Sequence, residues 1–223
     1  MPRESVLTYG RINIDAFPQD VVELMSYFRP LQPGQAVRAI PGAGLEVPVW
    51  ILGSSLYGAQ LAAALGLPYA FASHFAPAAL MQALEVYRAR FEPSQQNAGP
   101  FAMVGVNVIV AETDAQARRL FTSAQQRTVN SLRGTRGRLA PPIDDIETYW
   151  SPGEKLAAQR KLACSFVGSP EKVRRELIDF IAGTGADELM VNAAIFDHGA
   201  RLRSYELLAE QVAPALAKAP ALA

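Results

Sequence analysis

Four short apolar runs, separated by amphipathic helical patterns, constrain the fold of this chain more than any other feature of its sequence. The runs lie at residues 49–52, 69–72, 101–111 and 188–195. Continuous apolar runs of this kind are typical of strands that are buried on both faces. Because helical segments separate them, the strands are expected to be parallel and joined by right-handed crossovers. The sequence therefore predicts an α/β fold, and periodicity alone leaves open both a doubly wound sheet and part of a (β/α) barrel.

Helix start and stop signals divide the segments between these runs. Pro18 lies near the start of a first helix, and an Ala-rich helix after the first run ends at Gly66. Pro77 opens the next helix, residues 113–116 have the spacing of a capping box, and Ser169 followed by proline is another strong helix start. The whole chain, residues 1–223, is expected to form a single α/β domain.

The stretch from residue 134 to 152 breaks this pattern, because it lacks periodicity and collects Gly, Pro and Arg. Structureless loops of this length are usually functional or disordered, so we expect a long surface loop or a mobile lid. Trp150 beside it is either a hinge anchor or an aromatic wall for a planar ligand. The basic run of Arg133, Arg136 and Arg138 is either a phosphate contact or, more commonly, a solvated loop face.

Composition limits the classes of function. Lys plus Arg and Asp plus Glu are both 21, so no basic excess favours nucleic acid or an anionic membrane surface as a partner. Cys164 is the only cysteine, which excludes an intrachain disulfide and a thiolate metal cage, and it is expected to be a small buried residue. No signal-peptide pattern and no bilayer-length apolar stretch are present, so a cytoplasmic protein is expected.

Unusual residues follow the predicted strands, at the end where ligands bind in parallel α/β folds. Residues 53–57 (Gly-Ser-Ser-Leu-Tyr) follow the first run, 73–75 (Ser-His-Phe) the second and 196–198 (Phe-Asp-His) the fourth. Both histidines of the chain lie in this set. This coincidence is the main indication of a site that comes from the residues alone.

The segment 53–57 enters a helix directly, so free backbone N–H groups and the helix dipole would favour an anion there. The hydroxyls of Ser54, Ser55 and Tyr57 would add donors to a phosphate. The alternative is that one serine simply caps the helix. A Walker lysine and a G-x-G-x-x-G fingerprint are both missing, which argues against a nucleoside triphosphate or a dinucleotide.

His74 has two interpretations as well. It either hydrogen-bonds a polar ring edge and relays a proton near pH 7, or it is a strand-end histidine satisfied by backbone carbonyls. Asp197 and His198 are neighbours whose side chains diverge, so they form no dyad, and Asp197 is expected to cap a turn or to pair with Arg201. Two histidines without carboxylates at ligand spacing make no zinc site, so no metal is expected.

Five segments together resemble the bacterial luciferase-like family of flavin-dependent monooxygenases. They are residues 49–55, 67–75, 108–114, 167–173 and 185–191, in the family's order. The resemblance implies a TIM barrel that binds FMN, or a deazaflavin in some branches, at the carboxyl ends of its strands.

The resemblance also assigns roles to residues. Ser54 and Tyr57 would hold the flavin phosphate with support from Gly53 and Ser55, and His74 would stand near the isoalloxazine ring as the catalytic candidate. Residues 134–165 resemble the family's mobile lid. The implied reaction uses reduced FMN, delivered by a flavin reductase, and dioxygen to oxygenate a small organic substrate such as an aldehyde.

Only the later half of the family's barrel has a counterpart here, because an eight-stranded barrel needs about 250 residues and this chain supplies four clear strands. Four strands leave open edges and an uncovered face, so the chain is expected to form a homo-oligomer or to pair with a complementary barrel half. The alternatives are a noncatalytic or truncated half-barrel module and an unrelated open-sheet phosphate-binding protein, which a noncontiguous strand order would favour.

Overall fold

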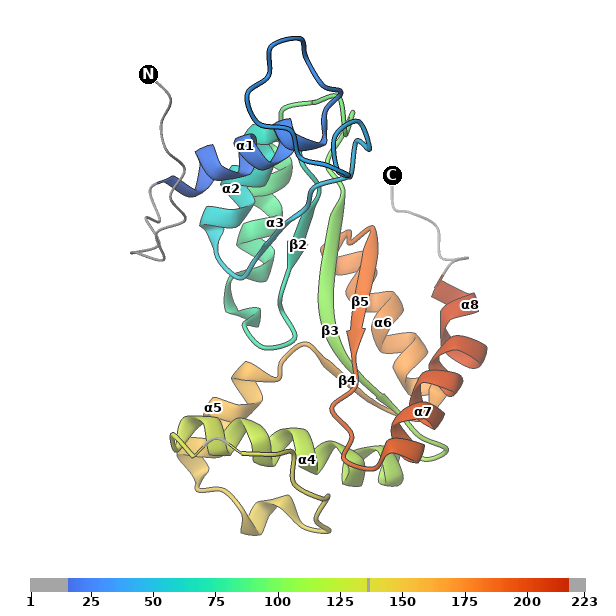
Figure 1. Cartoon of the computed structure of the whole chain (residues 1–223). Coiled ribbons are helices and arrows are strands. Elements are labelled where there is room, and N and C mark those ends of the chain that lie inside the picture. Colours follow the sequence, from blue (N-terminus) through green and yellow to red (C-terminus); the bar gives the residue numbers. More distant parts are fainter. Residues whose placement is uncertain (1–15, 136, 217–223) are drawn as a thin grey trace. The chain divides into compact units, whose positions relative to one another are not determined.

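The computed structural model describes residues 16–135 and 137–216, and the chain divides into two compact units, residues 1–49 and 50–223 (Figure 1). The first unit contains helix α1 (Phe17–Phe28), which has Pro18 in its first turn as the sequence predicts. After α1 the chain turns back on itself, and the N–H of Gly44 donates to the carbonyl of Phe28 at 3.0 Å. The conformation of Gly44 has φ +82°, which favours glycine.

The second unit is a parallel sheet with helices along it. Its strands are β1 (Ile51–Gly53), β2 (Tyr69–Phe71), β3 (Ala102–Val110), β4 (Ser165–Gly168) and β5 (Glu188–Asn192). Its helices are α2 (Leu56–Leu65), η2 (Pro77–Ala79), α3 (Leu80–Ala89), α4 (Asp114–Leu132), η3 (Ile146–Thr148), α5 (Pro152–Lys161), α6 (Pro170–Thr184), α7 (His198–Leu207), the π-helical η4 (Leu208–Val212) and α8 (Ala213–Leu216). Across the described part of the chain, no helix is both long and apolar enough to cross a membrane.

The strand order confirms the predicted α/β arrangement. The four predicted strands are neighbours in chain order, because β1 pairs with β2, β2 with β3, and β3 with β5, all parallel. The additional strand β4 pairs with the last residues of β3. Val104 pairs with both Phe71 and Leu189, and Asn107 with both Ser165 and Asn192, so β2 and β4 share one edge of β3 while β5 takes the other. The sheet is open.

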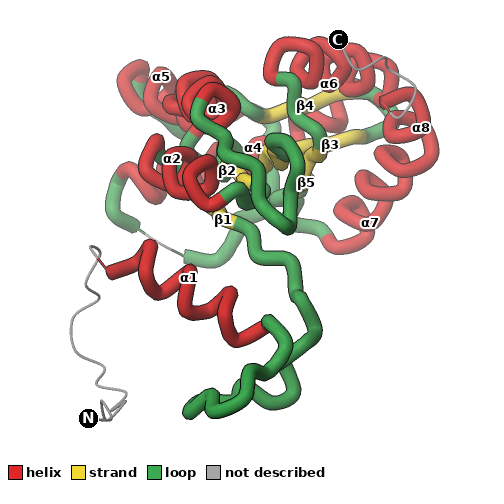
Figure 2. The backbone as a smooth tube through the Cα atoms, turned by 90° about the horizontal axis from the view of Figure 1, so that it is seen from above, coloured by secondary structure: helices red, strands yellow, loops and turns green. Residues whose placement is uncertain are grey.

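Helices cover one face of the sheet more completely than the other. Helices α2 and α3 lie beside β1 and β2 (Figure 2). Tyr69, Phe71 and Tyr87 of this layer are among the largest fully buried side chains. On the opposite face, Leu52 of β1 is 72% exposed and Met190 of β5 is 54% exposed. The prediction that the runs are buried on both faces is therefore wrong for these two strands, because no described residue of the second unit covers Leu52 or Met190 on this face.

The predicted loop at 134–152 is followed by helix α5, which the hydrophobic periodicity of the sequence did not indicate. Helix α5 begins at a capping box, in which the Ser151 N–H donates to Glu154 Oε2 at 2.8 Å and the Ser151 hydroxyl accepts from the Glu154 N–H at 3.4 Å. Only Ala158 of this helix is buried, so its pattern carries no apolar stripe. The segment 134–165 thus contains η3, α5 and the start of β4 as well as loop.

Candidate functional site

The end of β2 places His74 directly against the sheet. The Ser73 hydroxyl is buried and donates to the carbonyl of Gly105 at 2.6 Å, which fixes the turn that follows the strand. The imidazole then lies on the backbone of Gly105, so closely that a Cβ there would be 2.5 Å from His74 Nδ1. Only glycine leaves enough space at this position of β3.

Asn107 of β3 ties this strand end to its neighbours. Its Nδ2 donates to the carbonyl of His74 at 2.6 Å and to Ser165 Oγ at 3.2 Å, and its Oδ1 accepts from Asn192 Nδ2 at 2.9 Å. The side chain is buried, where such bonds are costly to break. Asn107, within β3, therefore connects the segment after β2 to the start of β4 and the end of β5, and it holds the backbone of His74 in place.

The His74 ring is polar but incompletely satisfied. Its Nδ1 is enclosed and has no hydrogen-bond partner in the described residues, so the backbone-satisfied interpretation does not hold for this nitrogen. The ring packs edge to face on Phe75, with 4.8 Å between centroids. Burial, and secondly the positive charge of Arg127, lower the pKa of His74 below its ordinary value and so favour the neutral ring. Because Nδ1 faces Gly105, Nε2 is the nitrogen left to meet a ligand.

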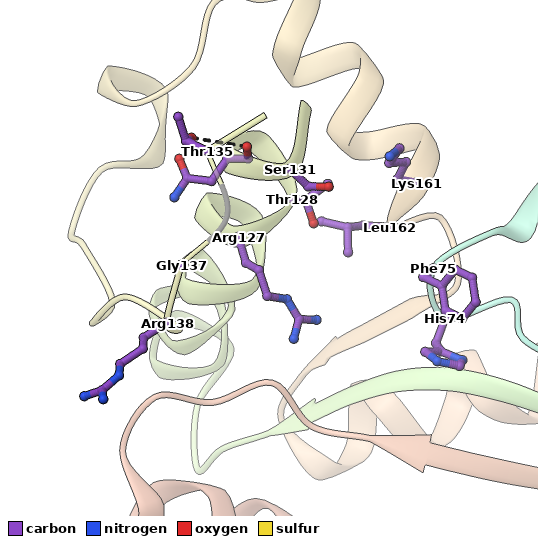
Figure 3. Close-up of a pocket in the computed structure, with 11 residues that line it drawn as sticks. His74, Phe75, Arg127, Thr128, Ser131, Thr135, Gly137, Arg138, Lys161 and Leu162 are labelled. Carbon is purple, nitrogen blue, oxygen red and sulfur yellow. Dashed lines mark hydrogen bonds between the residues drawn. The ribbon is translucent and has the colours of Figure 1, made fainter. Parts of the chain in front are cut away.

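A cavity of about 450 Å³ opens beside His74, between the end of β2 and helices α4 and α5 (Figure 3). Among the described residues, its lining contains three cationic side chains, Arg127, Arg138 and Lys161, and no carboxylate. The other lining residues are His74, Phe75, Thr128, Asn130, Ser131, Thr135, Gly137 and Leu162. Sequence reasoning identified His74 and Phe75 from their place after a strand but missed Arg127 and Lys161, which lie on helices.

The predicted phosphate residues lie at the neighbouring strand end. Strand β1 ends at Gly53, and Ser55 stands at the N-cap of α2 without making a side-chain cap, so the expectation that a serine hydroxyl caps this helix is not met by Ser55. The carbonyl of Ser55 accepts from the buried Tyr69 hydroxyl at 3.1 Å, which anchors the start of α2. Ser54, Ser55 and Tyr57 are exposed, and neither they nor Gly53 line the cavity at His74.

Comparison with known proteins identifies the family. The family model for luciferase-like monooxygenases matches residues 15–188. A luciferase-like monooxygenase of Escherichia coli K12 is 52% identical over 195 residues, which cover 87% of this chain. The chain belongs to the luciferase-like monooxygenase family. The resemblance noted in the sequence is confirmed, and an unrelated open-sheet protein is excluded.

Solved structures of luciferase-like proteins agree with the fold. The crystal structure of apo-MsnO8 is 31% identical, with a TM-score of 0.80 over 96% of this chain. The oxygenating constituent of 3,6-diketocamphane monooxygenase from Pseudomonas putida, solved with FMN, is 22% identical with a TM-score of 0.53 and shows the shared fold alone. This chain spans 58% of the length of the Escherichia coli relative and 64% of the MsnO8 chain.

The remaining candidates in this luciferase-like chain have structural roles. Asp197 caps α7 by accepting from the Ala200 N–H at 2.7 Å. This agrees with the first of the two expectations for Asp197, that it caps the turn that follows. His198 Nδ1 lies 2.8 Å from Arg201 and does not line the cavity, so the two histidines do not form one site. Cys164 is buried as predicted, and burial raises the pKa of its thiol.

The arginines of the basic run and Trp150 have different surroundings in the structure. Arg133 pairs with Glu154 at 2.7 Å, Arg138 lines the cavity, and Arg136 lies outside the described residues. The Trp150 indole N–H donates to Glu147 at 3.1 Å, and Trp150 is not part of the cavity wall. The interpretation of Trp150 as an aromatic wall therefore does not apply to this cavity.

Proposed function

We propose that this chain is the flavin-binding part of a monooxygenase that uses reduced FMN and dioxygen to oxygenate a small organic substrate such as an aldehyde. Family membership supports the class of reaction. The observation that carries the proposal is the cavity at the end of β2, which combines His74, with its neutral ring and its enclosed, unpartnered Nδ1, with cationic side chains. The exposed start of α2 lies at the next strand end.

The residues present fit a flavin mononucleotide. Its phosphate suits the start of α2, because the first turn of this helix contains no acidic residue and its backbone N–H groups lie beside the hydroxyls of Ser54, Ser55 and Tyr57, with Gly53 before them. Its ring, which has a polar edge, suits His74. When bound, the flavin supplies the redox chemistry with dioxygen. A deazaflavin would fit the same groups.

The protein's own residues would position and shield the reacting groups. His74 acts as the catalytic residue by exchanging a proton or a hydrogen bond through Nε2, and Asn107 holds its backbone. Residues 134–165 would close over the site and exclude water. In the described structure this segment is held to α4 by the exposed Arg119–Asp144 pair, by the two-point Arg133–Glu154 pair and by part-buried bonds such as the one from Gln126 Nε2 to the carbonyl of Pro141 at 2.9 Å.

Flavin binding tests the phosphate assignment directly. Ser54→Asp adds a negative charge at the start of α2 and should weaken FMN binding, measured by fluorescence quenching, roughly tenfold or more. Riboflavin, which lacks the phosphate, should bind the variant and the wild type equally. Gln60→Glu adds the same charge to the exposed side of α2 beyond its first turn and serves as the control. Equal effects of the two variants on FMN would refute the assignment.

Turnover tests the enzymatic part. With NADH, a flavin reductase, FMN and an aldehyde series, the chain should consume oxygen and form carboxylic acid, and His74→Gln should lower product formation by about 10². Product at background with FMN still bound would instead favour the noncatalytic module, and unchanged product with His74→Gln would remove the role of His74.

Assembly is the second part of the proposal. The exposed Leu52 and Met190, on a sheet whose end strands β1 and β5 each have one paired neighbour in the described residues, favour a homo-oligomer or a complementary barrel half. Light scattering after size-exclusion chromatography should show a species larger than 24.1 kDa, and a stable monomer would contradict self-association.

A further inference from the structure

We propose that the cavity beside His74 binds the carboxylate of a small organic substrate through Arg127, with the apolar body of that substrate against Phe75 and Leu162. This inference rests on the proposed monooxygenase function and names its substrate class. It places the anion of the substrate in the cavity and the phosphate of the flavin at the start of α2, at two different strand ends.

The charge of the cavity lining determines which kind of ligand it favours. The described residues that line it include three cations and no carboxylate, so an anionic ligand is favoured over a neutral or cationic one. Figure 3 shows Arg127 extending from α4 toward the end of the sheet where His74 lies, whereas Arg138 points away from the other lining residues. The charge of Arg127 also acts on the His74 ring, which places the two groups in one electrostatic environment.

The arginines along and just after α4 differ in whether they form an ion pair within the chain. Arg119 pairs with Asp144 at 2.6 Å and Arg133 with Glu154 at 2.7 Å, so both have a carboxylate within the chain. Arg127, between them on the same helix, makes no ion pair with any described residue. A guanidinium binds a carboxylate with two parallel hydrogen bonds, so this unpaired one is suited to a ligand carboxylate.

Neighbouring side chains define the rest of the ligand. Ser131 lies one turn after Arg127 on the same face of α4 and adds a hydroxyl donor to the cavity wall. Phe75 is 58% exposed and Leu162 is partly buried, so both present apolar surface to the cavity. A volume of about 450 Å³ is in the range of small-molecule sites. The ligand is therefore an amphipathic organic acid rather than a free inorganic anion.

A matched pair of probes tests the carboxylate without turnover. Phenylacetate and phenylacetamide have the same shape, and only the first is charged. Calorimetric titration of the full chain without flavin should show phenylacetate binding roughly ten- to a hundredfold more tightly, as expected for one charge-assisted pair. Arg127→Gln should abolish this preference, whereas Arg118→Gln, which removes an exposed charge from the same helix, should leave it unchanged. Circular dichroism melting should show that both variants remain folded.

The outcomes separate this inference from the proposed function. Equal binding of the two probes, or a preference that survives Arg127→Gln, would overturn it even if FMN still binds. If FMN displaces phenylacetate and Arg127→Gln weakens FMN but not riboflavin, Arg127 binds the flavin phosphate and the inference is again wrong. If Ser54→Asp weakens FMN and leaves phenylacetate unaffected, the two anion sites are distinct, as proposed. Carboxylate binding by a chain that binds no FMN would refute the flavin function and leave the anion site standing.

Discussion

Replacement of Gly105 by alanine tests the packing at the centre of the proposed site. The added Cβ would lie 2.5 Å from Nδ1 and 3.2 Å from Cε1 of His74, so the imidazole has to leave its position on the sheet. Overpacking of this kind typically costs about 1–3 kcal/mol. Loss of the conformational freedom of a strand glycine returns about 0.5–1 kcal/mol. The net expectation is a loss of about 0–2.5 kcal/mol in the free energy of unfolding.

Urea denaturation of a double-mutant cycle separates the two contributions. In a His74→Ala background the obstructing ring is absent, so Gly105→Ala should stabilise the chain by about 0.5–1 kcal/mol instead of destabilising it. The sign of the effect therefore reverses with the residue at position 74. For a chain of this size, each kcal/mol corresponds to a shift of about 2–4 °C in Tm, so thermal melting gives an independent measurement.

A second glycine provides the control for this cycle. Gly153 lies in α5, and nothing is within 4 Å of the position its Cβ would occupy. Gly153→Ala should therefore stabilise the chain slightly in both backgrounds. If Gly105→Ala has the same effect whether residue 74 is histidine or alanine, the close approach of the ring to β3 is wrong, and so is the proposed placement of His74.

Three further predictions concern the same region. In NMR titrations, with His198→Gln used to assign the two histidines, His74 should titrate below pH 6.5 and Arg127→Gln should raise its pKa, because a nearby cation disfavours the protonated ring. Because the pKa of His74 is lower in the folded state, the unfolded state binds more protons below about pH 6.5. The free energy of unfolding measured with urea should therefore fall as the pH decreases from about 6.5 toward the folded pKa. At higher pH this residue should cause no change. Tyr69→Phe should cost about 0.5–1.5 kcal/mol in urea and weaken FMN binding, because the start of α2 loses its anchor. Asn107→Leu should cost about 1–3 kcal/mol, because the carbonyl of His74 is left buried without its donor, and equal stability would refute this role.

The strands were predictable where their own residues form a long enough apolar run. The run 101–111 gives β3, whose residues are nearly all buried because it has neighbours on both edges. Strand β4 was missed because its four residues contain only Phe166 and Val167 as apolar side chains, too few for a pattern. Its extended form depends on the last residues of β3, a contact between segments about 58 residues apart, and no local signal reports such a contact.

Helix α5 was missed for a different reason. Its residues are polar around most of the helix, so hydrophobic periodicity gives no signal. The serine at 151 and the glutamate at 154 nevertheless have capping-box spacing, with proline between them, and this local signal was sufficient to predict the start of a helix. The exposure of Leu52 could not be predicted in the same way, since a local run does not reveal what covers its second face.

The residues of the candidate site also differ in whether the sequence predicts them. His74 was predictable because its place depends on topology alone: residues that follow a parallel strand lie at the ligand-binding end of the sheet whatever the packing. Arg127 was not, because local sequence does not distinguish it from Arg118 or Arg119 on the same helix. Its role depends on the rotation of α4 about its axis and on where that helix passes the end of β2. Residues on helices can therefore line a site only through tertiary packing, and the specificity of this cavity, unlike its location, is a property that the sequence pattern alone does not reveal.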